Sequence, residues 1–315
     1  MQETVRAIHR AKKILVVCHV NPDGDTIGCQ LALGLALMQL EKSVTLLSQD
    51  GVPARFQFLP GSELVQSEIE GAFDLGIAVD CGSIRQLGRS AKPFLKAKRT
   101  VQVDHHDFGK PFGDIQLVEE EAAAVGEIVF ELLRALKVEI TPAIASCLLT
   151  SIVVDTGSFR FTNIRAKTFD ISAKLVRTGV DLGHLIEETY WHKSRASAKL
   201  CGYCLSRVEF TDDGRVCWTE AKHKDFLRFK ANASDADPVA DDLRSIEGVK
   251  IAALFRETEK KNYRVSLRSS AGINVALVAK EFGGGGHHSS AGCVISGTEK
   301  EKKRLLNALT ALIGS

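Results

Sequence analysis

The sequence predicts an α/β protein: a larger N-terminal part with a mainly parallel sheet and helices on both faces, then a smaller C-terminal α/β domain. Short β-branched runs alternate with helical patterns through the first half of the chain, which is typical of parallel sheets. Several of these segments end in acidic residues, and the pattern changes character near Val208. Because 315 residues exceed a typical single domain, we expect two domains.

Apolar periodicity places the elements of the N-terminal part. We expect strands at 14–20, 43–47, 74–80 and 100–104, which are short, apolar and rich in branched side chains. We expect helices at 26–40, 122–136, 142–154, 166–178 and 182–189, where apolar residues recur at helical spacing. The stretch 56–60 is typical of a loop or a short edge element.

The C-terminal part is predicted to be a separate domain. We expect strands at 215–219, 249–258, 263–269 and 293–296, with the second and third paired. We expect helices at 273–282 and 300–313. The mixed-charge stretch 191–207 is interpreted as a linker helix, which places the two domains at 1–190 and 208–315.

The composition is that of an ordinary globular protein, with 44% hydrophobic and 25% charged residues. A net charge of +2 excludes a protein held to long DNA by bulk charge, while a local basic groove is compatible with it. Apolar runs are too short for a membrane span, so we expect no membrane contact. The eight cysteines lie mostly within apolar runs, as buried thiols do, which favours a reducing, cytoplasmic setting.

The polar cluster after the first expected strand is the first candidate site. It places one imidazole and two carboxylates, His19, Asp23 and Asp25, within seven residues. Pro22 and Gly24 end the strand geometry, so these side chains can converge. Imidazole and carboxylate are metal ligands, which makes a metal site the hypothesis. The alternative is a surface turn followed by a helix cap.

Similar acidic residues follow three later apolar segments. Asp80 ends one, Asp104 with His105 and His106 ends the next, and Asp155 ends a helical pattern. Because ligands gather at the carboxyl ends of the strands in parallel sheets, we expect these groups to meet at one edge. The alternative is that each Asp is a cap and each His a buried core residue. It requires that an Asp follow an apolar segment by chance at four places.

The ligand types indicate the chemistry of the expected site. Four or five clustered carboxylates need countercharge, which two divalent cations would supply. Histidine and aspartate without cysteine favour Mn²⁺ or a similar ion, with zinc as an alternative. Two such ions about 3.5–4 Å apart can clamp a phosphoryl oxygen and activate water for in-line attack. The expected reaction is therefore phosphoester hydrolysis.

Five motifs are spread along nearly the whole chain. They are His19-x-x-Pro-Asp23-x-Asp25, Val79-Asp80, Asp104-His105-His106, Asp155-Thr-Gly-Ser and the glycine-rich Gly284-Gly285-Gly286-His287. In these motifs the sequence resembles the DHH phosphoesterase family with its DHH-associated C-terminal domain. Within that family, the length looks most like that of small bacterial oligoribonucleases that also dephosphorylate pAp (adenosine 3′,5′-bisphosphate). It departs from the family pattern at Ser290 and at Ala123-Ala124, where relatives more often have alanine and hydroxyl residues, respectively.

The resemblance implies a role for each residue of the motifs. It implies one metal ion on His19, Asp23 and Asp80, and a second on Asp25, Asp80, His105 and Asp155. His106 would face the substrate phosphate as donor or general acid, and Asp104 would accept a ring N–H from a ligand histidine. The cofactors would be two divalent cations, with Mn²⁺ favoured over Mg²⁺ and Co²⁺.

Substrate contacts are expected mainly in the C-terminal domain. The candidates are Arg268, Gly284, Gly285, Gly286 and His287, with Arg160 in the N-terminal domain. Glycine backbone N–H groups can approach an anion closely, and arginine offers a bidentate fork for phosphate. The alternatives are a flexible glycine loop and solvent-exposed arginines.

The favoured function is a metal-dependent phosphodiesterase acting on RNA of about two to five nucleotides, the size that the resemblance implies, with 3′-phosphatase action on pAp. One alternative is hydrolysis of cyclic di-AMP or linear pApA by the same metals. Another is a nucleotide-binding sensor with a vestigial metal site, against which the intact ligand set argues. Expected partners are short single-stranded RNA or dinucleotides and pAp, and the sequence leaves a homodimer open.

Overall fold

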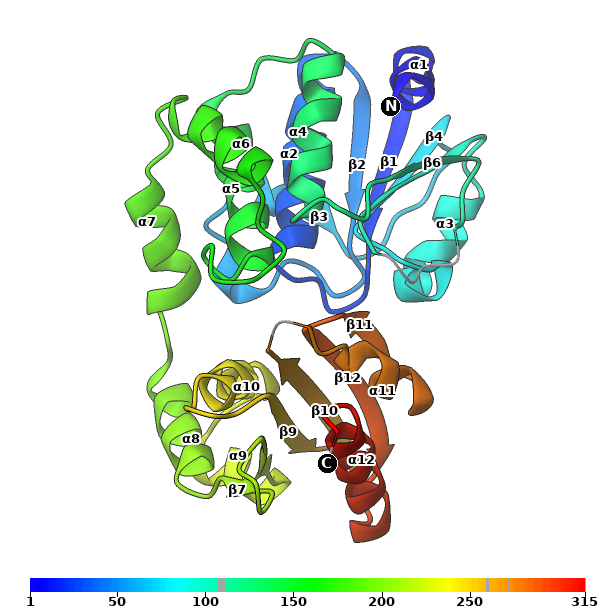
Figure 1. The fold of residues 1–315 in the computed structure, drawn as a ribbon. Helices are drawn as coiled ribbons and strands as arrows, with labels where there is room; N and C mark the ends of the chain where they lie inside the picture. Colours follow the sequence, from blue (N-terminus) through cyan, green and yellow to red (C-terminus); the bar gives the residue numbers. More distant parts are fainter. Residues whose placement is uncertain (107–110, 259–260, 271, 315) are drawn as a thin grey trace. The chain divides into compact units, whose positions relative to one another are not determined.

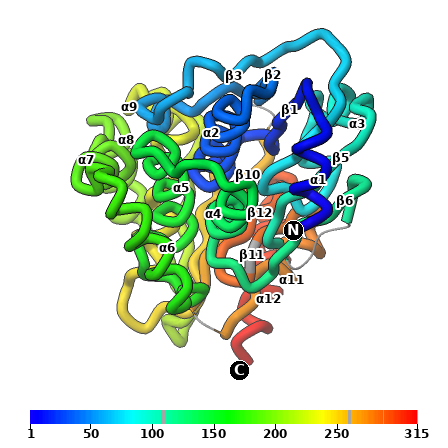
Figure 2. Tube along the Cα trace, turned by 90° about the horizontal axis from the view of Figure 1, so that it is seen from above, coloured from blue at the N-terminus to red at the C-terminus, as the bar shows by residue number. Residues whose placement is uncertain are grey.

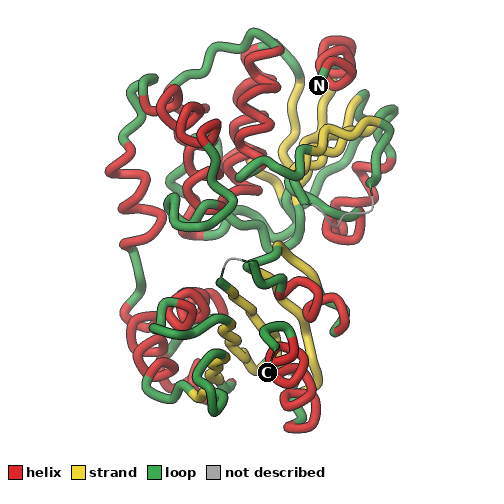
Figure 3. Tube along the Cα trace, viewed as in Figure 1, coloured by secondary structure: helices red, strands yellow, loops and turns green. Residues whose placement is uncertain are grey.

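The chain forms two compact units, Met1–His192 and Lys193–Ser315 (Figure 1). The structure is a computed structural model that describes residues 1–106, 111–258, 261–270 and 272–314, with the side chain of His287 also outside the description. Each unit has its own six-stranded sheet flanked by helices (Figure 3).

The first unit contains a parallel sheet with strand order β3-β2-β1-β4-β5-β6. The strands are β1 (Lys13–Cys18), β2 (Ser43–Leu47), β3 (Val65–Gln66), β4 (Leu75–Val79), β5 (Thr100–Asp104) and β6 (Ile115–Val118). Every neighbouring pair in this sheet runs parallel, which confirms the predicted sheet type. Strand β6 was not predicted, and β1 ends two residues earlier than expected, so His19 directly follows the strand.

Helices cover both faces of this sheet, as predicted. They are α1 (Gln2–Arg10), α2 (Gly24–Gln39), α3 (Ala91–Leu95), α4 (Val125–Ala135), α5 (Pro142–Asp155), α6 (Ala166–Val176) and α7 (Leu182–Ile186), with a π-helical turn η4 (Glu187–Trp191) and short 3₁₀ turns η1 (Ala54–Phe56), η2 (Ser62–Leu64) and η3 (Ile84–Ser90). Alternate side chains of β1 lie on opposite faces of the sheet. Ile14 and Val16 pack with α2, α4 and α5, whereas Leu15 and Val17 pack with α3 and η3.

Helices α2, α4 and α5 lie side by side and form one packed layer (Figure 2). Helices α2 and α5 are apolar on nearly all sides, which is typical of central buried helices. Two glycines permit their close approach. A Cβ atom at Gly28 would lie 2.4 Å from the carbonyl oxygen of Cys147, and one at Gly126 would lie 2.1 Å from Ser151 Oγ. This packing brings polar groups of all three helices together.

The second unit contains a mixed sheet with strand order β11-β12-β10-β9-β8-β7. The strands are β7 (Glu209–Phe210), β8 (Val216–Ala221), β9 (Ile251–Glu257), β10 (Asn262–Ser269), β11 (Gly285–His287) and β12 (Ser290–Ser296). The helices are α8 (Arg195–Leu205), α9 (His223–Phe229), α10 (Asp237–Arg244), α11 (Val275–Glu281) and α12 (Glu299–Ala311), with a 3₁₀ turn η5 (Ala233–Ala236). The expected pairing of 249–258 with 263–269 is confirmed as the antiparallel pair β9–β10.

Two segments of the second unit differ from the expectation. Helix α8, which the sequence analysis assigned to a linker, lies within this unit, where the Cys204 carbonyl accepts a hydrogen bond from Thr219 Oγ1 at 2.7 Å. Half of the glycine run forms strand β11 instead of a loop. The domain bounds of 1–190, 191–207 and 208–315 stay a prediction. Among the described residues, every helix is too short or too polar to cross a bilayer.

Candidate metal centre

The predicted ligands lie at the carboxyl edge of the first sheet and at two helix ends. His19 follows β1, Asp80 follows β4, His105 follows β5, Asp25 lies in the first turn of α2, and Asp155 is the last residue of α5. Parallel strands bring residues that are far apart in sequence to this edge. Asp80 has a left-handed backbone (φ 55°), a conformation that aspartate tolerates better than most residues.

A first group of ligand atoms comes from His19, Asp23 and Asp80, which lie within 4.8 Å of one another. His19 Nε2 is 3.6 Å from Asp80 Oδ2. The other ring nitrogen, Nδ1, lies 2.8 Å from the carbonyl oxygen of Val20. Because a carbonyl can only accept, Nδ1 carries the hydrogen, and the neutral ring keeps a lone pair on Nε2, as a metal ligand requires.

A second group comes from Asp25, His105 and Asp155, also within 4.8 Å of one another. His105 Nε2 lies 3.4 Å from Asp155 Oδ2, 3.8 Å from Asp25 Oδ2 and 3.9 Å from Asp80 Oδ1. Its Nδ1 donates to the carbonyl oxygen of Ala122 at 2.9 Å, which fixes the same tautomer as in His19.

Asp80 also belongs to a third group, with His105 and His106. One of its oxygens, Oδ2, lies close to His19, and the other, Oδ1, faces His105 and His106. The two oxygens of one carboxylate therefore face two different groups of ligand atoms. This arrangement would allow Asp80 to contact two ions, one through each oxygen.

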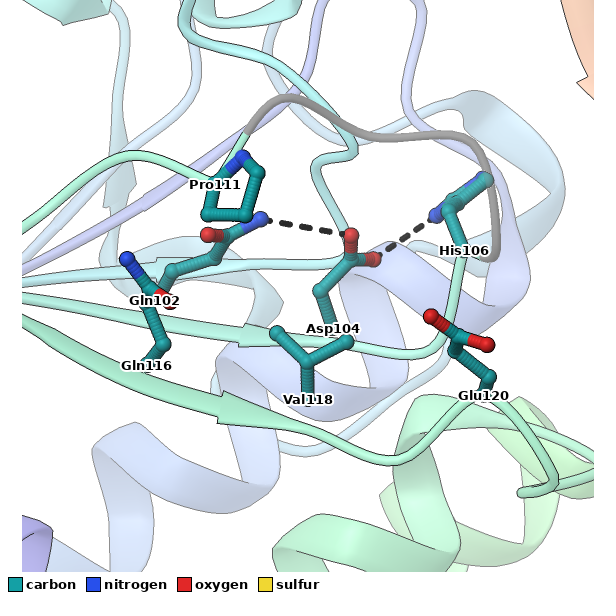
Figure 4. Close-up of a pocket in the computed structure, with 7 residues that line it drawn as sticks. All are labelled: Gln102, Asp104, His106, Pro111, Gln116, Val118 and Glu120. Carbon is teal, nitrogen blue, oxygen red and sulfur yellow. Dashed lines mark hydrogen bonds and ion pairs between the residues drawn. The ribbon is translucent and has the colours of Figure 1, made fainter.

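Asp104 accepts a hydrogen bond from a different histidine than expected. His106 Nδ1 donates to Asp104 Oδ1 at 2.7 Å, whereas Nδ1 of the expected ligand His105 donates to a backbone carbonyl. Figure 4 shows Gln102 on the other side of Asp104, with its Nε2 3.4 Å from Oδ2. Asp104 and His106 line a cavity of about 150 Å³. Asp104 therefore orients the histidine that was expected to face the substrate.

The clustered carboxylates disturb one another's protonation. Burial and the charges of Asp80 and Asp155 raise the pKa of Asp25 well above its usual value. Burial raises the pKa of Asp155 to about 7. Burial opposes a charge on His19, but Asp80 and Asp23 outweigh it and raise its pKa to about 9. Cations among these groups would relieve the repulsion between the carboxylates.

Burial also opposes the charge of Asp80, but the nearby histidines lower its pKa below the usual range. Burial likewise opposes a charge on His105, which Asp155, Asp25 and Asp80 outweigh, raising its pKa to about 9. The carboxylates stabilise a proton on the imidazole nitrogen of His105. A cation that binds this nitrogen must therefore displace that proton.

The sequence analysis did not identify two hydroxyl groups and one amide that contact these ligands. Thr26 Oγ1 lies 2.5 Å from Asp80 Oδ2. Ser151 Oγ donates to Asp25 Oδ1 at 2.5 Å, and the backbone N–H of Val125 donates to Asp25 Oδ2 at 2.9 Å. The one available signal is that Ser151 precedes Asp155 by one helical turn, which places both on the same face of α5.

The predicted substrate contacts have other interaction partners among the described residues. Arg160 is exposed, and its Nε donates to the Gly157 carbonyl at 2.6 Å. In the second unit, Arg268 Nε donates to Asp241 Oδ1 at 2.7 Å. A carboxylate therefore already engages the guanidinium that was expected to bind phosphate.

The glycines of the C-terminal motif have a steric role that the sequence analysis did not identify. A Cβ atom at Gly284 would lie 2.0 Å from the carbonyl oxygen of Gly292, and one at Gly286 would lie 2.5 Å from that of Ser290. Both glycines thus permit close packing of this segment on β12. At Gly285 an added Cβ atom would meet nothing within 4 Å, so this residue leaves open space beside the backbone. The side chain of His287 lies outside the described residues.

The fold and the site together define a class of protein. The chain is an α/β protein whose sheet edge gathers imidazole and carboxylate groups that could hold metal ions. The donor set fits hard or borderline divalent cations, because it consists of imidazole nitrogens and carboxylate oxygens without thiolate.

Comparison with known proteins identifies the family. The DHH family, N-terminal domain, matches residues 13–152, and the DHHA1 domain matches residues 219–315. The bifunctional oligoribonuclease and PAP phosphatase NrnA of Thermus thermophilus is 32% identical over 305 residues, which cover 94% of this chain and 89% of the relative. Its namesake in Bacillus subtilis is 26% identical over 314 residues, or 98% and 97% of the two chains. The chain therefore belongs to the DHH family of phosphoesterases and carries a C-terminal DHHA1 domain, as the motifs indicated.

A solved structure has the same fold. The crystal structure of an exopolyphosphatase-related protein from Bacteroides fragilis matches with a TM-score of 0.90 at 24% identity, covering 98% of this chain and 94% of that chain.

Proposed function

We propose that this protein is a dimetal-dependent phosphoesterase that hydrolyses short oligoribonucleotides to mononucleotides and removes the 3′-phosphate of pAp. The two relatives of this length are named for both activities, and each match spans nearly the whole chain. The preferred metal in this proposal is Mn²⁺, because imidazole and carboxylate together suit it well.

The observation that carries the proposal is the position of Asp80 between two groups of ligand atoms. Three members of each group lie within 4.8 Å of one another, which suits two neighbouring cations. His19, Asp23 and Asp80 would hold one ion, and Asp25, Asp80, His105 and Asp155 the other. When bound, the ions supply positive charge for the phosphate oxygens and an activated water molecule.

His106 has a separate role in the proposed reaction. Its Nδ1–H is held by Asp104, so Nε2 on the far side of the ring can donate a hydrogen bond or a proton to a phosphate oxygen. The buried carboxylate stabilises the protonated ring, because burial alone would lower the pKa of His106 and the hydrogen bond to Asp104 raises it. The two residues act as a donor and its orienting partner.

The second unit would bind the nucleotide. We assign this role to Arg268 and to the backbone around Gly285, where open space leaves room for a ligand. Arginine forms paired, charge-assisted hydrogen bonds with phosphate. Gly284 and Gly286 would contribute indirectly, by allowing the close packing on β12 that shapes this backbone.

A panel assay of the purified full chain with Mn²⁺ tests the proposal. The substrates are pAp, di- to pentaribonucleotides, linear pApA, cyclic di-AMP, pyrophosphate and long single-stranded DNA. We expect hydrolysis of pAp and the short oligoribonucleotides, with little action on long DNA. Preferential hydrolysis of cyclic di-AMP would identify a cyclic dinucleotide phosphodiesterase instead. Nucleotide binding without hydrolysis of any substrate would identify a sensor and overturn the proposal.

A further inference from the structure

Two buried hydroxyl groups contact the candidate ligands without belonging to either ligand group. Thr26, in the first turn of α2, is fully buried. Its Oγ1 lies 2.6 Å from His19 Nε2, 3.0 Å from Asp23 Oδ1 and 2.5 Å from Asp80 Oδ2. One hydroxyl oxygen is therefore within hydrogen-bonding distance of all three ligand atoms of the first group.

Ser151 has the corresponding position at the second group. It is fully buried on α5, one turn before Asp155, and its Oγ donates to Asp25 Oδ1 at 2.5 Å. Asp25 Oδ1 also lies 3.2 Å from Cys29 Sγ, and Asp25 Oδ2 accepts from the N–H of Val125. Ser151 contacts a carboxylate that belongs to the second group alone. Thr26 contacts the first group, and of the shared Asp80 it contacts Oδ2, the oxygen that faces His19 and not His105.

The surrounding packing fixes the Ser151 hydroxyl. Gly126 of α4 and Gly28 of α2 both lie against Ser151, and a Cβ atom at either would come within 3.3 Å of its atoms. Because α5 supplies both Ser151 and Asp155, one rigid helix sets the position of a ligand and the orientation of its neighbour Asp25. The close packing of α2, α4 and α5 therefore constrains where the side chains of Asp25 and Asp155 can lie.

We propose that Thr26 and Ser151 are positioning residues, each serving a different one of the two proposed metal sites. This inference rests on the proposed dimetal function. A carboxylate can rotate about its terminal bond, and a fixed donor on one oxygen determines which lone pairs face an ion. Partners of this kind typically change metal affinity about 10-fold to 100-fold when removed.

The test uses hydroxyl deletions that keep side-chain size nearly unchanged, Thr26→Val and Ser151→Ala. Mn²⁺ is titrated into each metal-free full-length variant, and free Mn²⁺ is measured by its electron paramagnetic resonance signal. We expect wild type to bind two ions. Each variant should retain one site near wild-type affinity and weaken the other about 10-fold to 100-fold. Thr26→Ser, which keeps the hydroxyl, should restore the affinity that Thr26→Val loses.

Anomalous scattering then identifies the weakened site. Crystals of each variant are soaked at an Mn²⁺ concentration that fills only the retained site. For Thr26→Val, we expect the manganese peak beside Asp25, His105 and Asp155. For Ser151→Ala, we expect it beside His19 and Asp23.

A matched control separates orientation from packing. Thr150 precedes Ser151 on α5, is also fully buried, and donates to a carbonyl of its own helix, Ser146, at 2.9 Å. Thr150→Val should bind two ions like wild type. If Ser151→Ala fails to fold by circular dichroism, Ser151→Cys, which keeps a side chain at this position but with a weaker donor, takes its place in the titration.

The outcomes distinguish this inference from the function on which it rests. Wild type that binds fewer than two ions defeats the dimetal proposal itself. Wild type that binds two ions, with both variants unchanged or with both sites weakened equally in each variant, overturns the site-specific roles of Thr26 and Ser151 alone.

Discussion

His106 and Asp104 form a buried pair in which Nδ1 of the ring lies 2.7 Å from a carboxylate oxygen. The side chain of Asp104 is 1% exposed and that of His106 is 16% exposed, so the carboxylate lies behind the ring, away from solvent. Neither group of ligand atoms around His19 or Asp25 includes Asp104. His106 does belong to such a group, with Asp80 and His105. In the proposed reaction, Asp104 therefore acts on the proton donor His106 and holds no metal ion.

Replacement of Asp104 by asparagine should lower kcat without loss of metal. We expect kcat on pAp to fall about 10-fold to 100-fold, because a neutral amide orients the ring but no longer stabilises its protonated form. Steady-state kinetics at saturating Mn²⁺, with calorimetric Mn²⁺ titration, measure the two effects. Gln116→Ala, which alters the same cavity, is the control and should leave kcat unchanged. Loss of a bound ion in Asp104→Asn would contradict this separation of roles.

Replacement of Asp80 should have the largest effect on catalysis. Its two oxygens face different ligand groups, so Asp80→Asn should weaken both proposed sites. We expect release of mononucleotide from a 5′-labelled trinucleotide to fall at least about 100-fold. Weaker binding would remove the cations that stabilise the negative charge of the phosphate oxygens, and loss of one such stabilising group has costs of that order. Asp170→Asn, an exposed carboxylate on α6, should behave like wild type. Full activity in Asp80→Asn would refute the bridging role.

The second unit contains a buried ionic network whose stability should depend on pH. The carboxylate of Glu220 on β8 accepts hydrogen bonds from Lys302 Nζ and, at 3.1 Å, from the Tyr263 hydroxyl. It also lies 3.4 Å from Lys222 Nζ. Burial opposes the charge of Glu220, but Lys302 outweighs it and lowers the pKa below its ordinary value of 4.5. Glu220→Gln should lower the free energy of unfolding of this unit by about 3 kcal/mol at pH 7, because Lys302 loses its buried partner.

The sign of the pH dependence follows from the lowered pKa. A carboxylate with a lower pKa in the folded state stabilises it above pH 4.5, and this contribution disappears as pH falls through the folded-state pKa. The difference between wild type and Glu220→Gln should therefore be constant from pH 7 to 5 and shrink below pH 4.5. Urea unfolding in a Trp191→Phe background, followed by Trp218 fluorescence, measures it within the second unit. A difference that grows on acidification would exclude the assigned partners.

The sequence predicted that these side chains meet at one sheet edge, because the physical reason is simple; their role as metal ligands stays a prediction. Residues that directly follow parallel strands must lie at one edge, so His19, Asp80 and His105 converge whatever the loops between them do. The steric role of the glycines was not predictable in the same way. Anion binding by the backbone and close packing against a strand both require a residue without a side chain. Only the distances at Gly284 and Gly286 distinguish these two interpretations.

The orienting groups were missed for a different reason. Thr26 begins an expected helix and Ser151 lies inside another, and at both places a small hydroxyl residue disturbs the apolar periodicity little and carries no signal of a contact with a distant carboxylate. The sequence predicted that Asp104 accepts a ring N–H from a ligand histidine, whereas it accepts one from His106. His105 and His106 are adjacent in sequence, and the backbone decides which ring faces Asp104. Such choices depend on side-chain directions at single residues, which residue spacing does not specify.

The ion pair between Arg268 and Asp241 predicts opposite changes in KM when one residue or the other is replaced. If Arg268 binds a substrate phosphate, Asp241 competes for the same guanidinium at 2.7 Å. Arg268→Ala should raise KM for a trinucleotide about 10-fold to 150-fold, since a hydrogen bond to a charged group is worth about 1.5–3 kcal/mol. Asp241→Asn should lower KM, because it removes the competing negative charge.

Steady-state kinetics on a trinucleotide and on a small artificial phosphodiester measure both effects. The artificial substrate has no second nucleotide for this unit to bind, so its KM should change little in either variant. Arg244→Ala, which removes an arginine from the same helix as Asp241, is the control for a general loss of positive charge. Equal changes on both substrates, or a higher KM in Asp241→Asn, would mean that Arg268 serves only to hold α10 against β10 and takes no part in substrate binding.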